Sequence, residues 1–559
     1  MYKLYRNIYS VMLAVALAAL TGCADGFEDA NRNPNQTDQV NPEYLFNTSV
    51  YNTLNAYCGS MKKVLLANYA QYYGGATGGQ VQRYANQGST NDGYWSNAYK
   101  AMLPLQFVDD KLDVNGEYHN RILITRIWKY YLYSQASSIW GPIPMSGALS
   151  GNAHVPYDSE KDIYYALLDG LKECAEGIDP DGDTFIKDPV YPLGNGFSDL
   201  DKWVRFANSL RLRLAVRICN ADQAKAKEVI SELMRDETLM MTSNDDNCKA
   251  KWGDNAGTRN YFYDYLVVNR EANSDKLHSA GEAILMYTAP YNDPRVKGWF
   301  TEADSRTMPD NFKWAPYWGQ PKVTNMPSGV TLEGGNPHSG KTAVDYSQLK
   351  DNFIAESYAE VIMNYAEVCL LKSEVVYKGL GTGSKTAAEY YEQGVRASMN
   401  QYGVSSGDAD AYLQVPGIRW NTLTDLEANA YGEDYYKDFI GIISSAITAG
   451  ELDPVYRQII MQQYIALFYQ PLDAWTLHRR SQVLEFTPHF QPETGYGAIN
   501  AGTADNPYAY VPARLVYPDS ERVNNLDEMN KGVAMLGGNG DTMGTLLWWA
   551  VPYRLNPYL

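Results

Sequence analysis

Cysteine and histidine are scarce in this 559-residue chain, with six of each. Apart from Cys23, the cysteines are odd in number and show no C-x-x-C spacing, and the histidines form no H-x-x-x-H pair. Such a dispersed set is typical of neither a disulfide framework nor a zinc site. We therefore predict no metal and no cofactor. The dispersed cysteines are Cys58, Cys174, Cys219, Cys248 and Cys369.

Catalytic motifs and excess positive charge are missing as well. Neither G-x-S-x-G nor H-E-x-x-H occurs, and the formal net charge is −18 at pH 7. A surface this acidic repels phosphate backbones, which argues against nucleic acid as a partner. No catalytic residue is predicted. Paired carboxylates of a glycoside hydrolase stay an open alternative, because their spacing is a spatial property.

The apolar run near the start, Val11 to Leu20, is too short to span a membrane as a stable helix. It follows Lys3 and Arg6 and is therefore typical of a secretory signal. Cys23 comes directly after Leu-Thr-Gly, which resembles a bacterial lipobox. The resemblance predicts a signal peptide over residues 1–22 and a lipoprotein anchored by acyl chains, such as palmitate, at Cys23. A plain signal peptide with a chance cysteine is the alternative.

Residues 23–559 have the composition of one globular domain, with 45% hydrophobic and 20% charged residues and no linker. The segment from Ala24 to Val40 is polar and turn-rich. Its acids Asp25, Glu28 and Asp29 resemble the export signal that carries some lipoproteins to the cell surface. A solvated tether with chance acids is the alternative. The chain also holds 46 Tyr and 12 Trp, which suit partly wet binding surfaces and helical cores.

Helical patterns dominate. One apolar stripe includes Trp203, Phe206 and Leu210, with Arg205, Arg211, Arg213 and Arg217 mostly off it, so we predict an amphipathic core helix opened by Ser198-x-x-Asp201. The other expected helices are 121–140 ending at Gly141-Pro142, one after the Ser159 cap, 357–378 ending at Gly379, one from the Thr386-x-x-Glu389 cap toward Gly403, and 455–468 with 472–480 split at Pro471.

Strand signals are sparse, so the fold class is expected to be mainly α, built of helix pairs. The uneven spacing of the helix starts shows no fixed repeat. The main insertion, about residues 251–351, lacks sustained periodicity and is rich in Gly, Pro, Asn and aromatics. The segment from Tyr69 to Trp95 has the same character. Long irregular loops on a helical scaffold are usually functional surfaces.

Four stretches of the chain carry distinctive signatures. They are an aromatic helix ending in Trp140-Gly-Pro-Ile-Pro144, Lys202-Trp-x-x-Phe-Ala-Asn-Ser-Leu-x-Leu-Arg213, Tyr365-Ala-Glu-Val with Lys372-Ser-Glu374, and Ile465-Ala-Leu-Phe468 with Asp473-Ala-Trp475 and Arg479-Arg480. The tail adds Pro512-x-Arg514 with Tyr517-Pro518 and Trp548-Trp549. Together these signatures extend over most of the chain and resemble the SusD/RagB family of outer-membrane nutrient-binding lipoproteins, in particular its SusD-like branch. Where family members often have Lys-Trp, this chain has Gln463-Tyr464, and it continues beyond Trp549.

The resemblance implies a fold of tetratricopeptide-like helix pairs that carries an irregular ligand-binding face. It also implies a SusC-like TonB-dependent outer-membrane transporter as partner, to which the lipoprotein delivers glycan or another nutrient oligomer such as peptide. The chain is accordingly expected to be a lipid-anchored outer-membrane protein facing the cell exterior, and no enzyme. An extracellular α-helical glycoside hydrolase and a purely structural helical scaffold are the alternatives.

An oligosaccharide ligand implies exposed aromatic rings for its C–H faces and polar side chains for its hydroxyls. Aromatics beside Pro and Gly are expected in exposed loops. The alternative is that they pack the loops onto the helices. The predicted ligand-binding residues are Asn311, Trp314, Tyr317 and Trp318 in the insertion, Tyr73, Arg83, Tyr94 and Trp95 in the early glycine-rich segment, and Trp252 beside Asp254 and Asn255.

Two further motifs resemble ligand sites but are not predicted to bind a nucleotide or calcium. Gly335 to Thr342 matches G-x-x-x-x-G-K-[ST], but no buried strand is expected before it, and a phosphate cradle needs a strand and a helix on either side. Asp179-Pro-Asp181-Gly-Asp183 resembles part of a calcium loop but lacks the distal Glu. A surface turn is predicted there.

Overall fold

A computed structural model of the chain describes residues 41–74, 88–111, 116–152, 154–269, 279–321, 338–422, 452–484, 511–537 and 540–551. The chain divides into two units, Met1–Asn41 and Pro42–Leu559, and the elements described below belong to the second. The expected signal peptide and Cys23 lie outside the described residues. Within the described ranges, no helix is both long enough and apolar enough to cross a membrane.

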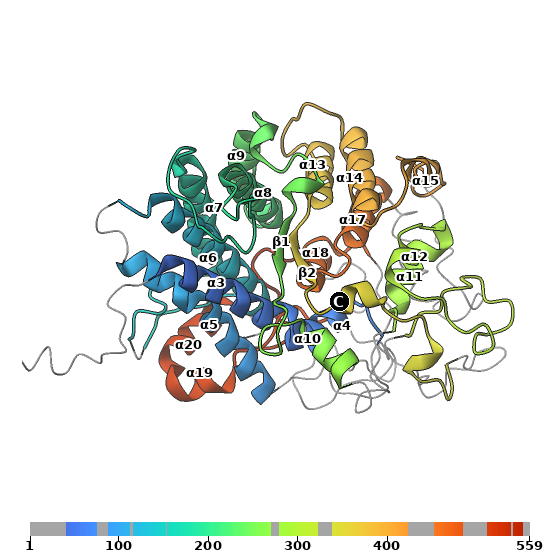
Figure 1. The fold of residues 1–559 in the computed structure, drawn as a ribbon, viewed down its shortest axis with the longest axis horizontal. Coiled ribbons are helices and arrows are strands. Elements are labelled where there is room, and N and C mark those ends of the chain that lie inside the picture. Colours follow the sequence, from blue (N-terminus) through green and yellow to red (C-terminus); the bar gives the residue numbers. More distant parts are fainter. Residues whose placement is uncertain are drawn as a thin grey trace, which may run out of the picture. The chain divides into compact units, whose positions relative to one another are not determined.

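Helices build most of the fold, in agreement with the predicted mainly α class (Figure 1). In the first half each long helix packs on the next along the chain, and in the second half α13 packs on α14, α17 and α8. The longer helices are α3 (Pro42–Thr53), α5 (Ser89–Lys111), α6 (His119–Trp140), α7 (Glu160–Gly177), α8 (Leu200–Ile218), α9 (Gln223–Leu233), α13 (Tyr365–Tyr377), α14 (Ala387–Gln401), α17 (Pro454–Ala466), α18 (Pro471–Ser481) and α20 (Leu526–Met535).

Shorter elements connect and flank these helices. The described parts of the insertion hold helices of at most seven residues, as its lack of periodicity predicted. The short helices are α4 (Ala67–Tyr69), α10 (Tyr261–Tyr263), α11 (Glu282–Thr288), α12 (Val296–Trp299), α15 (Ser406–Tyr412) and α19 (Asp519–Asn524). The π- and 3₁₀-helical turns are η1 (Leu54–Cys58), η2 (Lys62–Leu66), η3 (Glu237–Leu239), η4 (Asn244–Asp246), η5 (Asp264–Val268), η7 (Ala289–Tyr291), η8 (Ala343–Asp345) and η9 (Asp351–Ile354).

Several predicted helix ends are confirmed by their capping hydrogen bonds. The Ser159 side chain accepts from the backbone N–H of Asp162, and Thr386 forms a reciprocal capping box with Glu389. Gly379 follows α13 with a φ of 62°, a conformation that favours glycine after a helix. Pro471 is the first residue of α18, where its missing N–H is harmless.

Two predicted boundaries are wrong. Residues 357–363 are not helical, because Ala359–Met363 forms strand β2, which pairs antiparallel with β1 (Cys248–Lys251). The helix begins only after Asn364, whose side chain caps it by accepting from the N–H of Glu367 at 2.8 Å. Similarly, α8 is capped by Asp199 instead of Ser198, since the Asp199 carboxylate accepts from the N–H of Lys202.

The prediction that the arginines of α8 lie mostly off its core-facing stripe is wrong for three of them. Arg211, Arg213 and Arg217 are buried, because α8 is covered by α7, α9 and α13. Burial of arginine is costly unless each guanidinium is paired and hydrogen-bonded. The pairing therefore comes from other elements, as described below.

Candidate functional site

The early glycine-rich segment is joined to the insertion by backbone pairing. The N–H of Gly281 donates to the carbonyl of Tyr72 at 2.9 Å, and the N–H of Gly74 donates to the carbonyl of Ser279 at 3.0 Å. Tyr73 forms an antiparallel bridge with Ala280 between these bonds. Two regions far apart in sequence are therefore neighbours in space, where α4 precedes the first and α11 follows the second (Figure 1).

The end of the aromatic stretch joins the same pairing. The N–H of Gln320 donates to the carbonyl of Ala280 at 2.7 Å, and the N–H of Ser347 donates to the carbonyl of Trp318 at 3.0 Å. The N–H of Ala280 in turn donates to the carbonyl of Ser347 at 2.7 Å. We call residues 72–74, 279–282, 318–320 and 346–348 the junction. It holds four segments from both candidate regions in one place.

Glycine is required where these backbones come closest. A Cβ at Gly281 would lie 2.3 Å from the carbonyl oxygen of Gln71, and a Cβ at Gly319 would lie 2.6 Å from the Cα of Glu282. Backbone atoms cannot yield as a flexible side chain can, so any larger residue would push the segments apart. The glycine content of these loops thus serves their close approach.

The expected exposure of Trp314 and Trp318 is wrong. Their side chains are 5% and 0% exposed and pack with Phe312. Trp318 also lies 4.7 Å from the ring of Tyr346 and 5.6 Å from that of His338. Aromatic rings at these separations attract one another beyond the apolar area that they bury. These rings form a small core. Two of them, Trp318 and Tyr346, belong to the junction, so the core packs directly on its segments.

His338 belongs to this small core. Its Nδ1 lies 2.9 Å from the hydroxyl of Tyr346, and burial, with a smaller effect of Lys341, lowers its pKa to about 3. The imidazole is therefore neutral at physiological pH, in keeping with its stacking on Trp318. It acts as a packing and hydrogen-bonding group here.

Of the four ligand-binding residues predicted in the insertion, Asn311 and Tyr317 are the two that reach the surface. Asn311 is exposed and adopts a left-handed backbone conformation (φ 58°), while Tyr317 is half-buried. The N–H of Tyr317 donates to the carbonyl of Trp314 at 3.0 Å, so the buried ring beneath sets its position. Partial burial, followed by the nearby carboxylate of Glu302, raises the pKa of Tyr317, and its hydroxyl stays protonated.

The candidates of the early segment are mostly buried. Tyr73 packs against Tyr469, with ring centroids 6.3 Å apart. Tyr94 and Trp95 lie in helix α5, which starts at Ser89, so the loop predicted up to Trp95 is wrong at its end. Arg83 lies outside the described residues.

Trp95 contributes to the core around the first family signature. Its ring lies 5.1 Å from that of Trp140 and 6.3 Å from that of Tyr517. Tyr94 is buried as well, and burial raises its pKa to about 12. Both rings therefore hold α5 against the rest of the fold.

Trp252 is buried beside an ion pair. Its indole N–H donates to Glu360 at 3.1 Å, and the other carboxylate oxygen of Glu360 accepts from Lys62 at 2.6 Å. Asp254 and Asn255 next to it are exposed in a turn. Glu360 thus links Lys62 of the η2 turn to the two-stranded sheet, and the buried tryptophan has little surface left for a ligand.

One residue close to the junction had no site role in the sequence analysis. Tyr464, where relatives often have tryptophan, stacks on Tyr72 with ring centroids 4.9 Å apart. Its hydroxyl donates to the carbonyl of Ala70 at 2.9 Å, and Tyr72 donates to the carbonyl of Tyr464 at 2.6 Å. The departure from the family pattern thus contacts the segment that enters the junction. In the sequence, the tyrosine in place of the family's usual tryptophan was the only feature that pointed to this contact.

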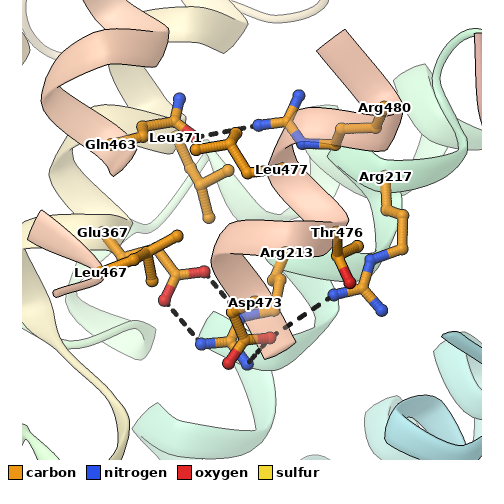
Figure 2. A pocket seen from close by; sticks show the side chains of 10 residues that line it. All are labelled: Arg213, Arg217, Glu367, Leu371, Gln463, Leu467, Asp473, Thr476, Leu477 and Arg480. Atoms are coloured by element: carbon orange, nitrogen blue, oxygen red, sulfur yellow. Dashed lines mark hydrogen bonds and ion pairs between the residues drawn. The ribbon is translucent and has the colours of Figure 1, made fainter. Parts of the chain in front are cut away.

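The family signatures meet in a buried ionic network (Figure 2). Arg213 of α8 binds Glu367 of α13 through two hydrogen bonds of 2.6 and 2.5 Å. The same guanidinium lies 3.3 Å from Asp473 of α18, and Arg217 lies 3.8 Å from it. Three helices that carry three different signatures are therefore tied together by charge.

A second set of ionic contacts extends the network. Arg480 binds both carboxylate oxygens of Glu374 at 2.7 Å, and the amide of Gln463 donates to the same carboxylate at 2.9 Å. Burial raises the pKa of Glu374, but Arg480 and these hydrogen bonds outweigh it and bring the pKa to about 2. Glu374 is therefore ionised. The residue Gln463, unusual for the family, is part of this network.

The network encloses a cavity of about 20 Å³. One water needs roughly 10–15 Å³ of such volume, whereas ligand pockets span roughly 300–1,000 Å³. The cavity can hold a water but no nutrient. The signatures of this family are accordingly structural in this chain.

The nucleotide-binding pattern is not built as a phosphate cradle in its described part. Lys341 donates to the carbonyl of Thr307 at 2.7 Å and lies 5.4 Å from the ring of Trp318. Thr342 caps η8, a turn of three residues, where a working motif would open a long helix. Residues 335–337 lie outside the described part of the chain.

One aspartate of the calcium-like turn, Asp183, caps a helix. Asp183 accepts from the backbone N–H groups of Asn120 and Arg121 at 2.7 and 3.3 Å, at the start of α6. Asn120 in turn accepts from the N–H of Asp179 at 2.9 Å. Carboxylates at a helix N-terminus are stabilised by its orphan N–H groups, which accounts for this cluster.

Comparison with known proteins gives the family. The description of the matching family model is "Starch-binding associating with outer membrane", in the SusD-like group, and the match spans residues 34–518. No curated protein sequence matches the chain. Solved structures match over nearly the whole chain.

Three of these structures illustrate the likeness. A SusD homologue from Bacteroides uniformis is 25% identical, with a TM-score of 0.68, 92% of this chain covered and 100% of that one. A chitin-binding SusD homologue from Flavobacterium johnsoniae is 21% identical, with a TM-score of 0.67, 91% of this chain and 99% of that one. A SusD homologue from Parabacteroides distasonis is 21% identical, with a TM-score of 0.69, 91% of this chain and 98% of that one.

The described residues form a mainly helical protein in which irregular loops meet at one junction. Because the family model matches most of its length, the chain belongs to the SusD-like family. The resemblance noted from the four signatures is therefore confirmed, and so is the mainly α fold.

Proposed function

We propose that this protein is a cell-surface lipoprotein that binds glycan and delivers it to a SusC-like TonB-dependent transporter of the outer membrane. The observation that carries the proposal is the junction, in which backbone hydrogen bonds bring the two aromatic, glycine-rich regions together. The family's association with starch binding, and the chitin-binding relative, support carbohydrate as the ligand class. Delivery and the transporter partner are inferred from the resemblance to SusD-like lipoproteins.

Within the predicted ligand-binding residues we assign contact roles to Asn311 and Tyr317. Both reach the surface beside the junction, one with an amide for sugar hydroxyls and one with a ring for a C–H face. The buried Trp314 and Trp318 position them from beneath. Arg83 stays a predicted contact.

The glycoside hydrolase alternative is disfavoured by where the acids lie. An acid catalyst needs a carboxyl group with a raised pKa that faces substrate. In the described residues burial raises the pKa of Glu160, to about 7, and that of Glu367, and both side chains are enclosed in the core. Neither can reach a glycosidic bond. We propose that the protein binds without catalysis.

Calorimetric titration with maltotriose, chitotriose, soluble starch and solubilised chitin tests the proposal. We expect one carbohydrate to bind to the wild type, and Asn311→Ala and Tyr317→Ala each to raise its Kd on the order of tenfold, about 1.4 kcal/mol. Tyr44→Ala, which removes a 71% exposed ring from α3, is the matched control and should leave Kd unchanged.

Two results would contradict the proposal. Binding of none of these carbohydrates would remove glycan as the ligand class. Release of reducing sugar by the wild type would show hydrolysis and favour the enzyme.

A further inference from the structure

An open groove runs along α14, away from the residues of the junction. It has a volume of about 560 Å³ and lies between α14, the start of α13 at Tyr365 and the segment from Thr242 to Asn244. Its lining on α14 extends from Glu389 to Asn400, which at 1.5 Å per residue is about 16 Å. None of the residues that line the groove belongs to the junction. Its size lies within the range of roughly 300–1,000 Å³ found for ligand sites.

Hydrogen bonds hold the amide side chains of the groove in place. Asn244 donates to the carbonyl of Ala397 at 2.9 Å and to the side-chain oxygen of Asn400 at 3.0 Å. Gln393 accepts from Lys385 at 2.7 Å and donates to the hydroxyl of Tyr365. Both N–H groups of Asn244 are used in these bonds and its side-chain oxygen is buried, so Asn244 orients Asn400. Gln393 keeps one N–H and one lone pair, which it presents to a ligand without first losing conformational entropy.

The exposed polar groups keep hydrogen-bonding capacity. Within the described residues the Asn400 side chain takes part only as an acceptor, which leaves both of its N–H groups for another partner. Glu392 is exposed and has no hydrogen bond to a described residue. An amide donor and a carboxylate acceptor therefore lie along one wall of the groove.

The charge and polarity of the lining select the class of ligand. Lys385 and Arg396 face Glu389 and Glu392, and Arg396 is also paired with Asp410, so an anionic ligand gains no net attraction. Recognition of extended, helical or proline-rich peptides uses a strand edge or an apolar groove, and the lining residues include no strand and no aliphatic side chain larger than Ala397. Amides, carboxylates and hydroxyls in a row match the adjacent hydroxyls of a neutral sugar.

We propose that the α14 groove is a second carbohydrate subsite. The inference rests on the proposed function and deepens it: a polymeric glycan engages the junction face and the groove of one molecule at the same time. The second contact is then intramolecular, and its effective concentration strengthens the binding of polymer more than that of short oligosaccharides.

The double variant Glu392→Ala/Asn400→Ala tests the groove, with Glu173→Ala/Asn195→Ala as a matched control on exposed positions elsewhere. For the carbohydrate that the wild type binds, affinity electrophoresis in soluble starch or solubilised chitin gives polymer binding, and calorimetry gives the Kd for maltotriose or chitotriose. We expect the groove variant to weaken polymer binding at least tenfold. The Kd of the trisaccharide at the junction face should change less than twofold.

Hydrogen exchange provides a readout that does not depend on a variant. Added polymer should slow amide exchange in residues 385–400 of the wild type, and the trisaccharide should not. Unchanged polymer binding by the groove variant, or no protection of residues 385–400, would overturn the subsite while leaving the proposed function in place. If the wild type binds no carbohydrate of this panel, the proposed function and the subsite fail together.

Discussion

Buried ionisable side chains set the behaviour of this protein at the scale of single residues. Glu160, the first residue of α7, accepts a hydrogen bond from the backbone N–H of Trp548 at 3.0 Å. Burial raises its pKa to about 7, although the Trp548 hydrogen bond and the charges of Arg514 and Arg479 oppose the shift. Glu160 thus links the start of α7 to Trp548 of the C-terminal signature. Its ionised form lowers the free energy of unfolding, because burial disfavours the charge.

This shift predicts a loss of stability as the pH rises. The folded chain holds a proton on Glu160 between the unfolded pKa of about 4.5 and the folded pKa of about 7, so the contribution is complete below about 4.5 and is lost as pH rises through 7. We expect Glu160→Gln to be more stable than the wild type at pH 8, by about 3 kcal/mol at most, and similar at pH 4.5. Urea unfolding of both proteins at the two pH values measures the difference.

The comparison with the wild type cancels the other titrating groups. His338 and His478 have pKa values lowered to about 3 by burial and so act in the opposite direction below pH 6.5, equally in both proteins. Equal stability differences at pH 4.5 and 8 would show that Glu160 does not titrate in this way.

At the scale of elements, two sets of contacts hold the helices and loops together. The ionic network joins α8, α13 and α18 through Arg213, Glu367 and Asp473, all of them buried. The junction joins loops from two regions by backbone pairing around Gly281. In each set, one residue makes the central contacts: Arg213 in the ionic network and Gly281 in the junction.

Removing Arg213 from the network leaves Glu367 without its counter-charge and Asp473 with only the more distant Arg217. We expect Arg213→Met to lower the free energy of unfolding by about 3–5 kcal/mol, because Glu367 and Asp473 lose their main counter-charge. Arg306→Met is the control, since that side chain is 86% exposed and its ion pair should contribute less than about 1 kcal/mol. Urea unfolding followed by circular dichroism provides both values. Similar losses in the two variants would argue against a structural role of the network.

Gly281→Ala tests the junction. The added Cβ would lie 2.3 Å from the carbonyl oxygen of Gln71, so we expect faster hydrogen exchange in residues 72–74 and 279–282 and weaker carbohydrate binding. Gly407→Ala in α15 meets no atom within 4 Å and should stabilise the helix by about 0.5–1 kcal/mol without affecting binding. Unchanged exchange at the junction in Gly281→Ala would contradict its assigned role.

At the scale of the whole molecule, the proposal joins an anchor, a helical body and a binding face. We expect Cys23→Ser to move the protein from the membrane fraction of the producing cells to a fraction without membranes, because the cysteine sulfur would no longer carry acyl chains. Immunoblotting of the fractions measures this, with Cys58→Ser as the control. Carbohydrate affinity of the purified variant should match that of the wild type. Retention of Cys23→Ser in the membrane would exclude the predicted anchor.

The sequence by itself determined the family, the mainly α class and seven of the eleven longer helices. These depend on local causes such as caps at Ser159 and Thr386, the Gly379 and Pro471 ends, and apolar spacing, all of which can be read along the chain. The longer helices α3, α5, α9 and α20 and the strands β1 and β2 were not predicted. The short run of β2 gains its conformation from pairing with β1, more than a hundred residues earlier.

Only the tertiary structure decided which aromatic and charged side chains are buried. Trp314 and Trp318 stand beside Pro and Gly and look exposed in sequence, yet both are buried, Trp314 against Phe312 and Trp318 against Phe312, Tyr346 and His338. The arginines of α8 look solvated by helical spacing, yet Glu367 and Asp473 from distant helices pair with Arg213. Burial and ion pairing are properties of contacts between segments, and no local pattern contains them.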